Sequence, residues 1–131
     1  GTMMIIKYTA FYAGMLAVFY VALSFRIIKL RLVHKVGIGH GESNTLHRAI
    51  RVHANFAEYV PFALLLLAFL ELNKAEIWVL NILGTALLIG RLFHAMGLGK
   101  SAGTSIARTI GGILTYLMML GAALLNILAV Y

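Results

Sequence analysis

Long apolar runs dominate the chain, and short polar stretches separate them. The apolar runs cover about residues 3–28, 56–72, 77–92 and 106–131. A helix that crosses a bilayer needs roughly 20 residues, so the two central runs must extend into their polar flanks. The second can begin at Ser43 or Asn44, which are favoured N-cap residues. The pattern predicts four helices, at about residues 3–33, 44–72, 75–97 and 104–130.

The links between these helices are short, and two of them are rich in glycine. Glycines at positions 37, 39 and 41 favour a turn in the first link, the second is centred on Asn73, and the third reads GLGKSAGTS. Short links join antiparallel neighbours. The sequence therefore predicts an all-α membrane protein, an up-down antiparallel bundle of four transmembrane helices, in which residues 1–131 form a single domain.

Composition supports a membrane environment. The 131 residues are 62% apolar and only 11% charged, whereas a water-soluble domain of this size needs more polar surface. The net charge is +7, but the basic residues flank apolar runs and form no separate basic domain. This placement favours membrane lipid or an anionic substrate as the partner and argues against nucleic acid. Because the chain has no cysteine, any thiol must arrive with a ligand.

Basic residues near the helix ends predict the orientation in the membrane. The first loop is flanked by Arg26, Lys29, Arg31, Lys35, Arg48 and Arg51, and the third by Arg91, Lys100 and Arg108. The opposite side carries Lys7 and Lys74. We therefore expect the first and third loops to be cytoplasmic and both termini to lie on the other side.

A polar stripe lies on the second helix. Arg51, Asn55 and Glu58 recur at i, i+4 and i+7, Tyr59 lies beside them, and His53 points elsewhere. An unpaired carboxylate at membrane depth costs roughly 3 kcal/mol. Arg51 and Glu58 lie two helical turns apart, about 10 Å along the helix axis. We therefore expect that they do not pair directly. Either another helix supplies partners, or a zwitterionic ligand places its carboxylate on Arg51 and Asn55 and its ammonium on Glu58.

Other readings of the polar residues stay open. The stripe could simply join helices by hydrogen bonds. In a small transporter, Glu58 would couple to a proton or cation, although the neighbouring Arg51 and Asn55 suit an anion better. No metal site is expected, because no two of the five histidines stand at i and i+4.

The pattern Arg51-x-x-x-Asn55-x-x-Glu58-Tyr59-x-Pro61 resembles the signature of the MAPEG family, the membrane-associated proteins in eicosanoid and glutathione metabolism. That family includes membrane glutathione transferases, leukotriene-C synthase and prostaglandin E synthase. The resemblance extends to length, helix number, loop order and charge placement. It implies a homotrimer that binds its co-substrate, glutathione, between neighbouring subunits near the cytoplasmic side.

The resemblance also implies roles for individual residues. Glutathione would be held by Arg51, Asn55, Glu58 and Tyr59, by Arg31 with Lys29 as the alternative, and by His94 in the pattern Arg91-x-x-His94. Leu98 stands where the family often has tyrosine, which keeps a non-catalytic glutathione- or lipid-binding protein open.

Arg108, in Ser105-Ile-Ala-Arg108-Thr109, matches the family's thiol-activating arginine and is the expected catalytic residue, since a guanidinium favours the nucleophilic thiolate. Its alternative role is an anchor at the membrane interface. The implied activity is that of a bacterial inner-membrane glutathione transferase or peroxidase, acting on hydrophobic electrophiles or lipid hydroperoxides.

Overall fold

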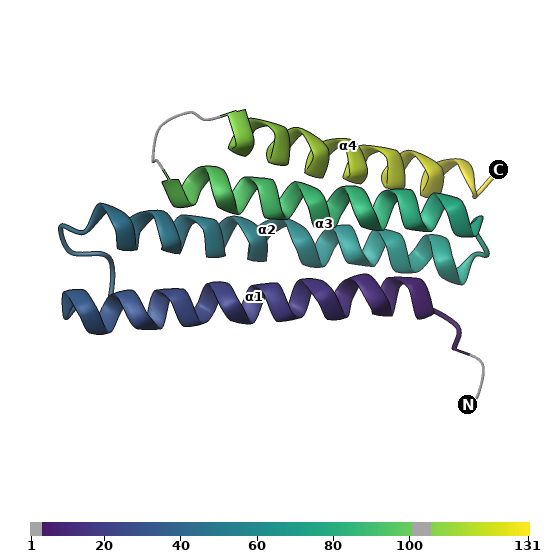
Figure 1. Cartoon of the computed structure of the whole chain (residues 1–131). Helices are drawn as coiled ribbons and strands as arrows, with labels where there is room; N and C mark the ends of the chain where they lie inside the picture. The colour runs from purple at the N-terminus through teal and green to yellow at the C-terminus, as the bar shows by residue number, and fades with distance from the viewer. Residues whose placement is uncertain (1–3, 101–105) are drawn as a thin grey trace.

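Four long helices make up the fold. The computed structural model describes residues 4–100 and 106–131, without the side chains of residues 98–100. The helices are α1 (Lys7–His34), α2 (Asn44–Leu72), α3 (Ile77–Lys100) and α4 (Ile106–Leu128) (Figure 1). Each is long and apolar enough to cross a membrane. The all-helical architecture expected from the apolar runs is therefore confirmed.

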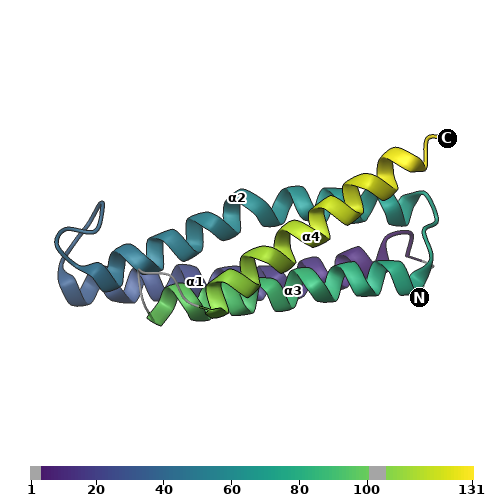
Figure 2. The same cartoon turned by 90° about the horizontal axis from the view of Figure 1, so that it is seen from above.

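The helices run in alternating directions, so the start of α1 and the end of α4 lie at the same end of the bundle (Figure 1). α1 packs against α2 and α3, while α4 packs against α3 and crosses α2 obliquely (Figure 2). The contact between α3 and α4 is the most extensive. It depends on Gly111, where an added Cβ would collide with the backbone of Gly90 and His94. Glycine thus lets the two backbones approach closely, as at many helix contacts in membranes.

The outer surface is apolar, as lipid requires. Large side chains such as Phe11, Val18, Phe62, Ile82 and Leu120 are exposed along the helices. The interior is packed with Leu16, Leu67, Leu87, Met118 and Ala122, each at most 2% exposed. An apolar exterior of this extent suits a protein whose solvent is the bilayer.

The helix ends show where local sequence sets the boundaries. Ser43 accepts a hydrogen bond from the backbone N–H of Leu46 at 3.1 Å, which confirms it as the N-cap of α2. The expected end points of the other helices shift by a few residues: α3 continues to Lys100 rather than residue 97, and α4 ends at Leu128 rather than residue 130. The expected start of the fourth helix at residue 104 lies outside the described residues.

The expected start of the first helix at residue 3 was wrong, because α1 begins at Lys7. The side chain of Glu71, from the last turn of α2, accepts hydrogen bonds from the backbone N–H groups of Tyr8 at 2.9 Å and Thr9 at 2.7 Å. Glu71 is only 9% exposed. A carboxylate at a helix N-terminus satisfies free N–H groups and faces the positive end of the helix dipole. The cap thus comes from a distant part of the chain.

We predict that Glu71→Ala lowers stability by about 1–3 kcal/mol, because two backbone N–H groups lose a charged acceptor. The matched control is Glu42→Ala, which removes the same charge from an exposed loop residue and should change stability by less than about 0.5 kcal/mol. Thermal unfolding of both variants in detergent provides the measurement. Equal midpoints for the two variants would show that the cap contributes nothing.

Candidate functional site

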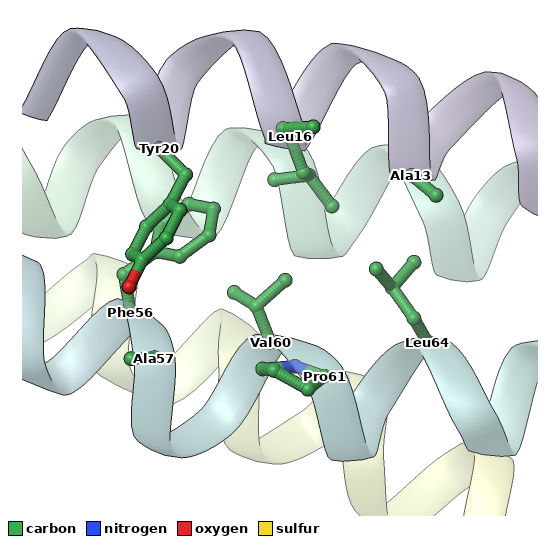
Figure 3. Close-up of a pocket in the computed structure, with 9 residues that line it drawn as sticks. Ala13, Leu16, Tyr20, Phe56, Ala57, Val60, Pro61 and Leu64 are labelled. Carbon is green, nitrogen blue, oxygen red and sulfur yellow. The ribbon is translucent and has the colours of Figure 1, made fainter. Parts of the chain in front are cut away.

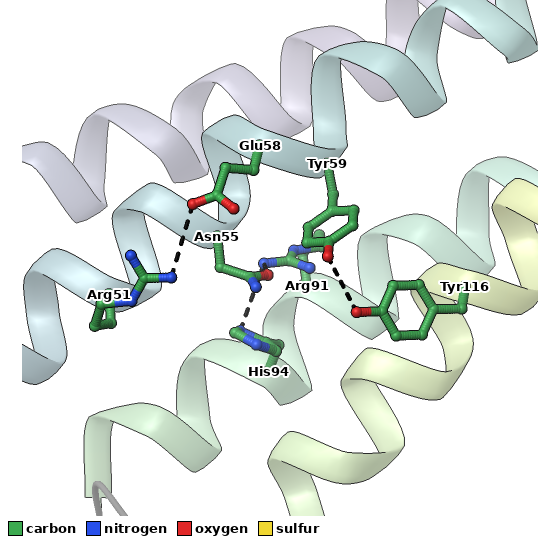
Figure 4. A network of polar contacts seen from close by, with 7 residues as sticks. All are labelled: Arg51, Asn55, Glu58, Tyr59, Arg91, His94 and Tyr116. Carbon is green, nitrogen blue, oxygen red and sulfur yellow. Dashed lines mark hydrogen bonds and ion pairs between the residues drawn. The ribbon is translucent and has the colours of Figure 1, made fainter.

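A polar cluster lies between α2, α3 and α4, with Arg91 at its centre (Figure 4). Arg91 is 2% exposed. It donates hydrogen bonds to Asn55 Oδ1 at 2.5 Å and to Thr115 Oγ1 at 3.4 Å, and its Nη2 lies 3.5 Å from His94 Nδ1. The guanidinium also lies 5.9 Å from the centre of the Phe56 ring. One side chain therefore connects three helices inside the bundle.

Arg51 and Glu58 form an ion pair on the outer side of α2, at 3.7 Å (Figure 4). The expectation that they lie too far apart was wrong, because both side chains are long and reach toward each other along the helix. The side chains are 50% and 56% exposed, and an ion pair so accessible holds its partners weakly. Both charges thus remain accessible to a ligand or a second subunit.

Tyr59 and Tyr116 meet hydroxyl to hydroxyl across α2 and α4, with 3.1 Å between the oxygens. Their rings are edge to face, with centres 5.5 Å apart. Both rings line a small polar cleft beside Arg91 and also a wider apolar groove between α2 and α4. The two tyrosines therefore mark the boundary between a polar and an apolar space.

The polar cleft is much smaller than the apolar spaces around it. Its volume is about 20 Å³, enough for roughly one water molecule. The groove between α2 and α4 measures about 350 Å³. A further apolar pocket of about 240 Å³ lies between α1 and α2, where Ala13 and Ala57 leave room beside Leu16, Val60 and Leu64 (Figure 3). A tripeptide therefore does not fit inside the polar cleft of one chain, whereas apolar groups have room nearby.

Most of the expected glutathione-binding residues fall into one region. Asn55, Tyr59 and His94 line the polar cleft, and the Arg51–Glu58 pair lies beside it on α2. His53 points away from the stripe, as predicted, and it faces α1: its Nε2 lies 2.9 Å from Ser24 Oγ, and its ring stacks on Tyr20.

Arg31 lies in the last turn of α1, from which it donates to the carbonyl oxygens of two residues of the first loop, Gly39 at 2.7 Å and Val36 at 3.4 Å. These contacts hold the loop. The expected contact of Arg31 with a glutathione carboxylate stays a prediction.

Arg108 lies in the first turn of α4, half-buried, and close enough to His94 for their charges to interact. A second guanidinium therefore lies within electrostatic range of His94. Ser105 and the side chain of Leu98 lie outside the described residues.

Two residues of the cluster, Arg91 and Thr115, were given no role in the site from the sequence. Arg91 had been counted with the basic residues that flank the third loop, yet it is buried among three helices. An available signal was its place inside an apolar run, one turn before His94, where a charged residue needs a partner or a function.

Comparison with known proteins identifies the family of this chain. The sequence profile of the MAPEG family matches residues 9–128, a range that contains every expected site residue. The chain is also similar to Inner membrane protein YecN of Escherichia coli K12 and of Escherichia coli O6:H1. Each is 42% identical over 89 residues, which cover 68% of this chain and 68% of the relative. Since the profile reaches all four helices, the chain belongs to the MAPEG family.

Proposed function

We propose that this protein is a glutathione-dependent membrane transferase or peroxidase that acts on hydrophobic electrophiles or lipid hydroperoxides. The observation that carries the proposal is the grouping of an exposed Arg51–Glu58 pair with the polar cleft around Asn55 and His94. Arg108 adds a cation at the same place. Membership of the MAPEG family supports the assignment, since that family includes glutathione transferases.

The α2 stripe suits the zwitterionic glutamyl end of glutathione. Its carboxylate would bind Arg51 and Asn55, and its ammonium would bind Glu58. The ligand would exchange the weak internal ion pair for two charged contacts of its own. Tyr59 and His94, which line the cleft beside the stripe, would contact the remainder of the tripeptide.

The hydrophobic substrate would use the apolar spaces that adjoin the cluster. The groove between α2 and α4 shares Tyr59 and Tyr116 with the polar cleft, so an apolar molecule in the groove ends where the polar groups begin. This arrangement suits a lipophilic substrate with one reactive polar end. A protein that binds glutathione without turning it over is the second candidate, favoured by Leu98 in place of the family's frequent tyrosine.

A neighbouring subunit would complete the site. The polar cleft of about 20 Å³ is too small for a tripeptide, and half-exposed Arg51 and Glu58 face outward from the chain. We therefore propose a homotrimer in which glutathione lies between subunits and Arg31 reaches one of its carboxylates. Closed cyclic symmetry is the usual way in which membrane and soluble chains satisfy such surfaces.

The membrane location follows from the four apolar helices and from a relative named as an inner membrane protein. We propose a multi-pass protein of the bacterial inner membrane. Arg31, Arg51 and Arg108 lie toward the end of the bundle that carries the first loop, opposite the start of α1 and the end of α4 (Figure 1). This end would be cytoplasmic by the distribution of basic residues.

The first test of this proposal is calorimetry with glutathione and the purified protein. Arg51→Ala and Glu58→Gln should each weaken binding by about 1.5–3 kcal/mol, the usual contribution of a charged hydrogen bond. The control is His53→Ala, which alters the opposite face of α2 and should leave the affinity unchanged. Absence of binding to the unmutated protein at millimolar glutathione would refute the proposal.

The proposed trimer is tested by native mass spectrometry in mild detergent. We expect the mass of three chains, because the polar groups left exposed on α2 need partners from a second chain. A spectrum that contains only monomers under conditions that preserve other membrane trimers would contradict this prediction.

Arg108→Ala should separate binding from chemistry. We expect it to keep most of the glutathione affinity, because Arg51, Asn55 and Glu58 still hold the glutamyl end. The ultraviolet absorbance of the thiolate near neutral pH and the rate of dye conjugation should both fall, and higher pH should partly restore the rate. Arg108→Lys should recover only part of the activity, since lysine lacks the planar donor fork. Normal thiolate absorbance together with normal turnover in Arg108→Ala would leave Arg108 as an interface anchor only.

A further inference from the structure

Arg91 is a buried cation that pairs with no carboxylate in the described part of the chain. The whole sequence contains four acidic residues, Glu42, Glu58, Glu71 and Glu76. Glu58 pairs with Arg51, Glu71 caps α1 at the far end of the bundle, and the other two are exposed. Among the described residues, therefore, none of the four forms an ion pair with Arg91.

The groups around Arg91 are neutral or cationic. Asn55 and Thr115 offer only dipoles, and its Nε has no hydrogen-bond acceptor among the described residues. A buried charge without a counter-charge costs several kcal/mol. The charge of Arg108, felt at His94, adds to the positive potential on this side of the cluster. The site is thus electrically incomplete by one negative charge.

The space beside Arg91 limits what that negative charge can be. The cleft of about 20 Å³ is lined by Asn55, Tyr59, His94, Thr115 and Tyr116 together with Arg91 itself. A volume of this size holds roughly one water molecule, and hence one heavy atom of similar size. A carboxylate or phosphate group has three or more heavy atoms and does not fit. A single sulfur atom at the tip of a side chain does.

We propose that Arg91 and this cleft form a site for a single anionic atom, occupied during the reaction by the thiolate sulfur of the co-substrate. This inference rests on the proposed function. The S–H bond breaks, the electron pair stays on sulfur, and the proton passes to solvent water, so nothing is oxidised or reduced. Arg91 is then a second catalytic cation beside Arg108, and it stabilises the thiolate from inside the bundle.

If Arg91 has this role, its uncompensated charge lowers the stability of the protein when no ligand is bound. An apolar side chain of similar length avoids the cost of burying a charge that has no counter-charge. Arg91→Met should therefore unfold at the same temperature as the unmutated protein or at a higher one when no ligand is present. A residue kept only for helix packing would behave in the opposite way, because its loss would remove contacts to α2 and α4.

The decisive experiment compares glutathione with its analogue that carries a methyl group in place of the thiol. Calorimetry at mildly alkaline pH should show that the unmutated protein prefers glutathione roughly tenfold, as for one charged contact. Arg91→Met should remove this preference, and Arg91→Lys should retain part of it. Arg51→Met is the matched control: it should weaken both compounds equally and leave the preference intact.

The outcomes separate this inference from the proposed function. The thiolate site is overturned if Arg91→Met still prefers glutathione to its methyl analogue. It is also overturned if this variant loses affinity for both compounds equally. In either case the proposed glutathione binding stands. If neither compound binds the unmutated protein, the proposed function fails. The anion site is then tested alone, by comparing the unfolding midpoint in sodium bromide with that in sodium gluconate at equal ionic strength. Bromide should raise the unfolding midpoint of the unmutated protein but not of Arg91→Met, and equal midpoints in the unmutated protein overturn the site. If Arg91→Met does not fold, Arg91→Lys takes its place: an undiminished preference of that variant for glutathione over the methyl analogue overturns the thiolate site.

Discussion

The hydrogen bonds of Arg91 to α2 and α4 set the relative placement of the three helices that carry the candidate site. In the hydrocarbon interior no water substitutes for a missing partner, so these contacts restrict how the three helices can be placed. The close approach of Gly90 and Gly111 is part of the same arrangement, because it brings Thr115 of α4 within reach of the guanidinium on α3. Packing of small residues and pairing of polar groups therefore act together.

A second polar contact performs the same task at the other end of the bundle. Glu71 ties α2 to the start of α1, which elsewhere packs through apolar side chains such as Leu16 and Leu23 and through the Tyr12–Asn81 and Ser24–His53 hydrogen bonds. Apolar contacts give little preference for one register in a membrane, because lipid tails are as apolar as leucine. The few directional hydrogen bonds between the helices thus fix how they align along their length.

The sequence alone predicted the features that depend on local pattern. Apolar runs gave the number of helices, Ser43 was confirmed as an N-cap, and helical spacing placed His53 away from Asn55. Features that depend on side-chain reach or distant partners were missed. Treating α2 as a rigid rod hid the Arg51–Glu58 pair, and nothing near residue 7 shows that Glu71 caps α1. Counting Arg91 as a loop residue likewise hid the centre of the cluster, although its neighbours Asn55 and His94 had been identified.

The polar groups of the site differ in depth, and that difference constrains any ligand they share. Arg51 and Glu58 are half-exposed and opposite in charge, whereas Arg91 is buried, positive and beside a space for one atom. A ligand that satisfied both regions would need a zwitterionic end outside and a small anionic atom at the end of a short arm inside. Glutathione has these two parts, since its glutamyl group is zwitterionic and its cysteine ends in a single sulfur. A simple amino acid lacks the inner atom and a simple lipid lacks the outer charges, so neither would satisfy both regions of the proposed site.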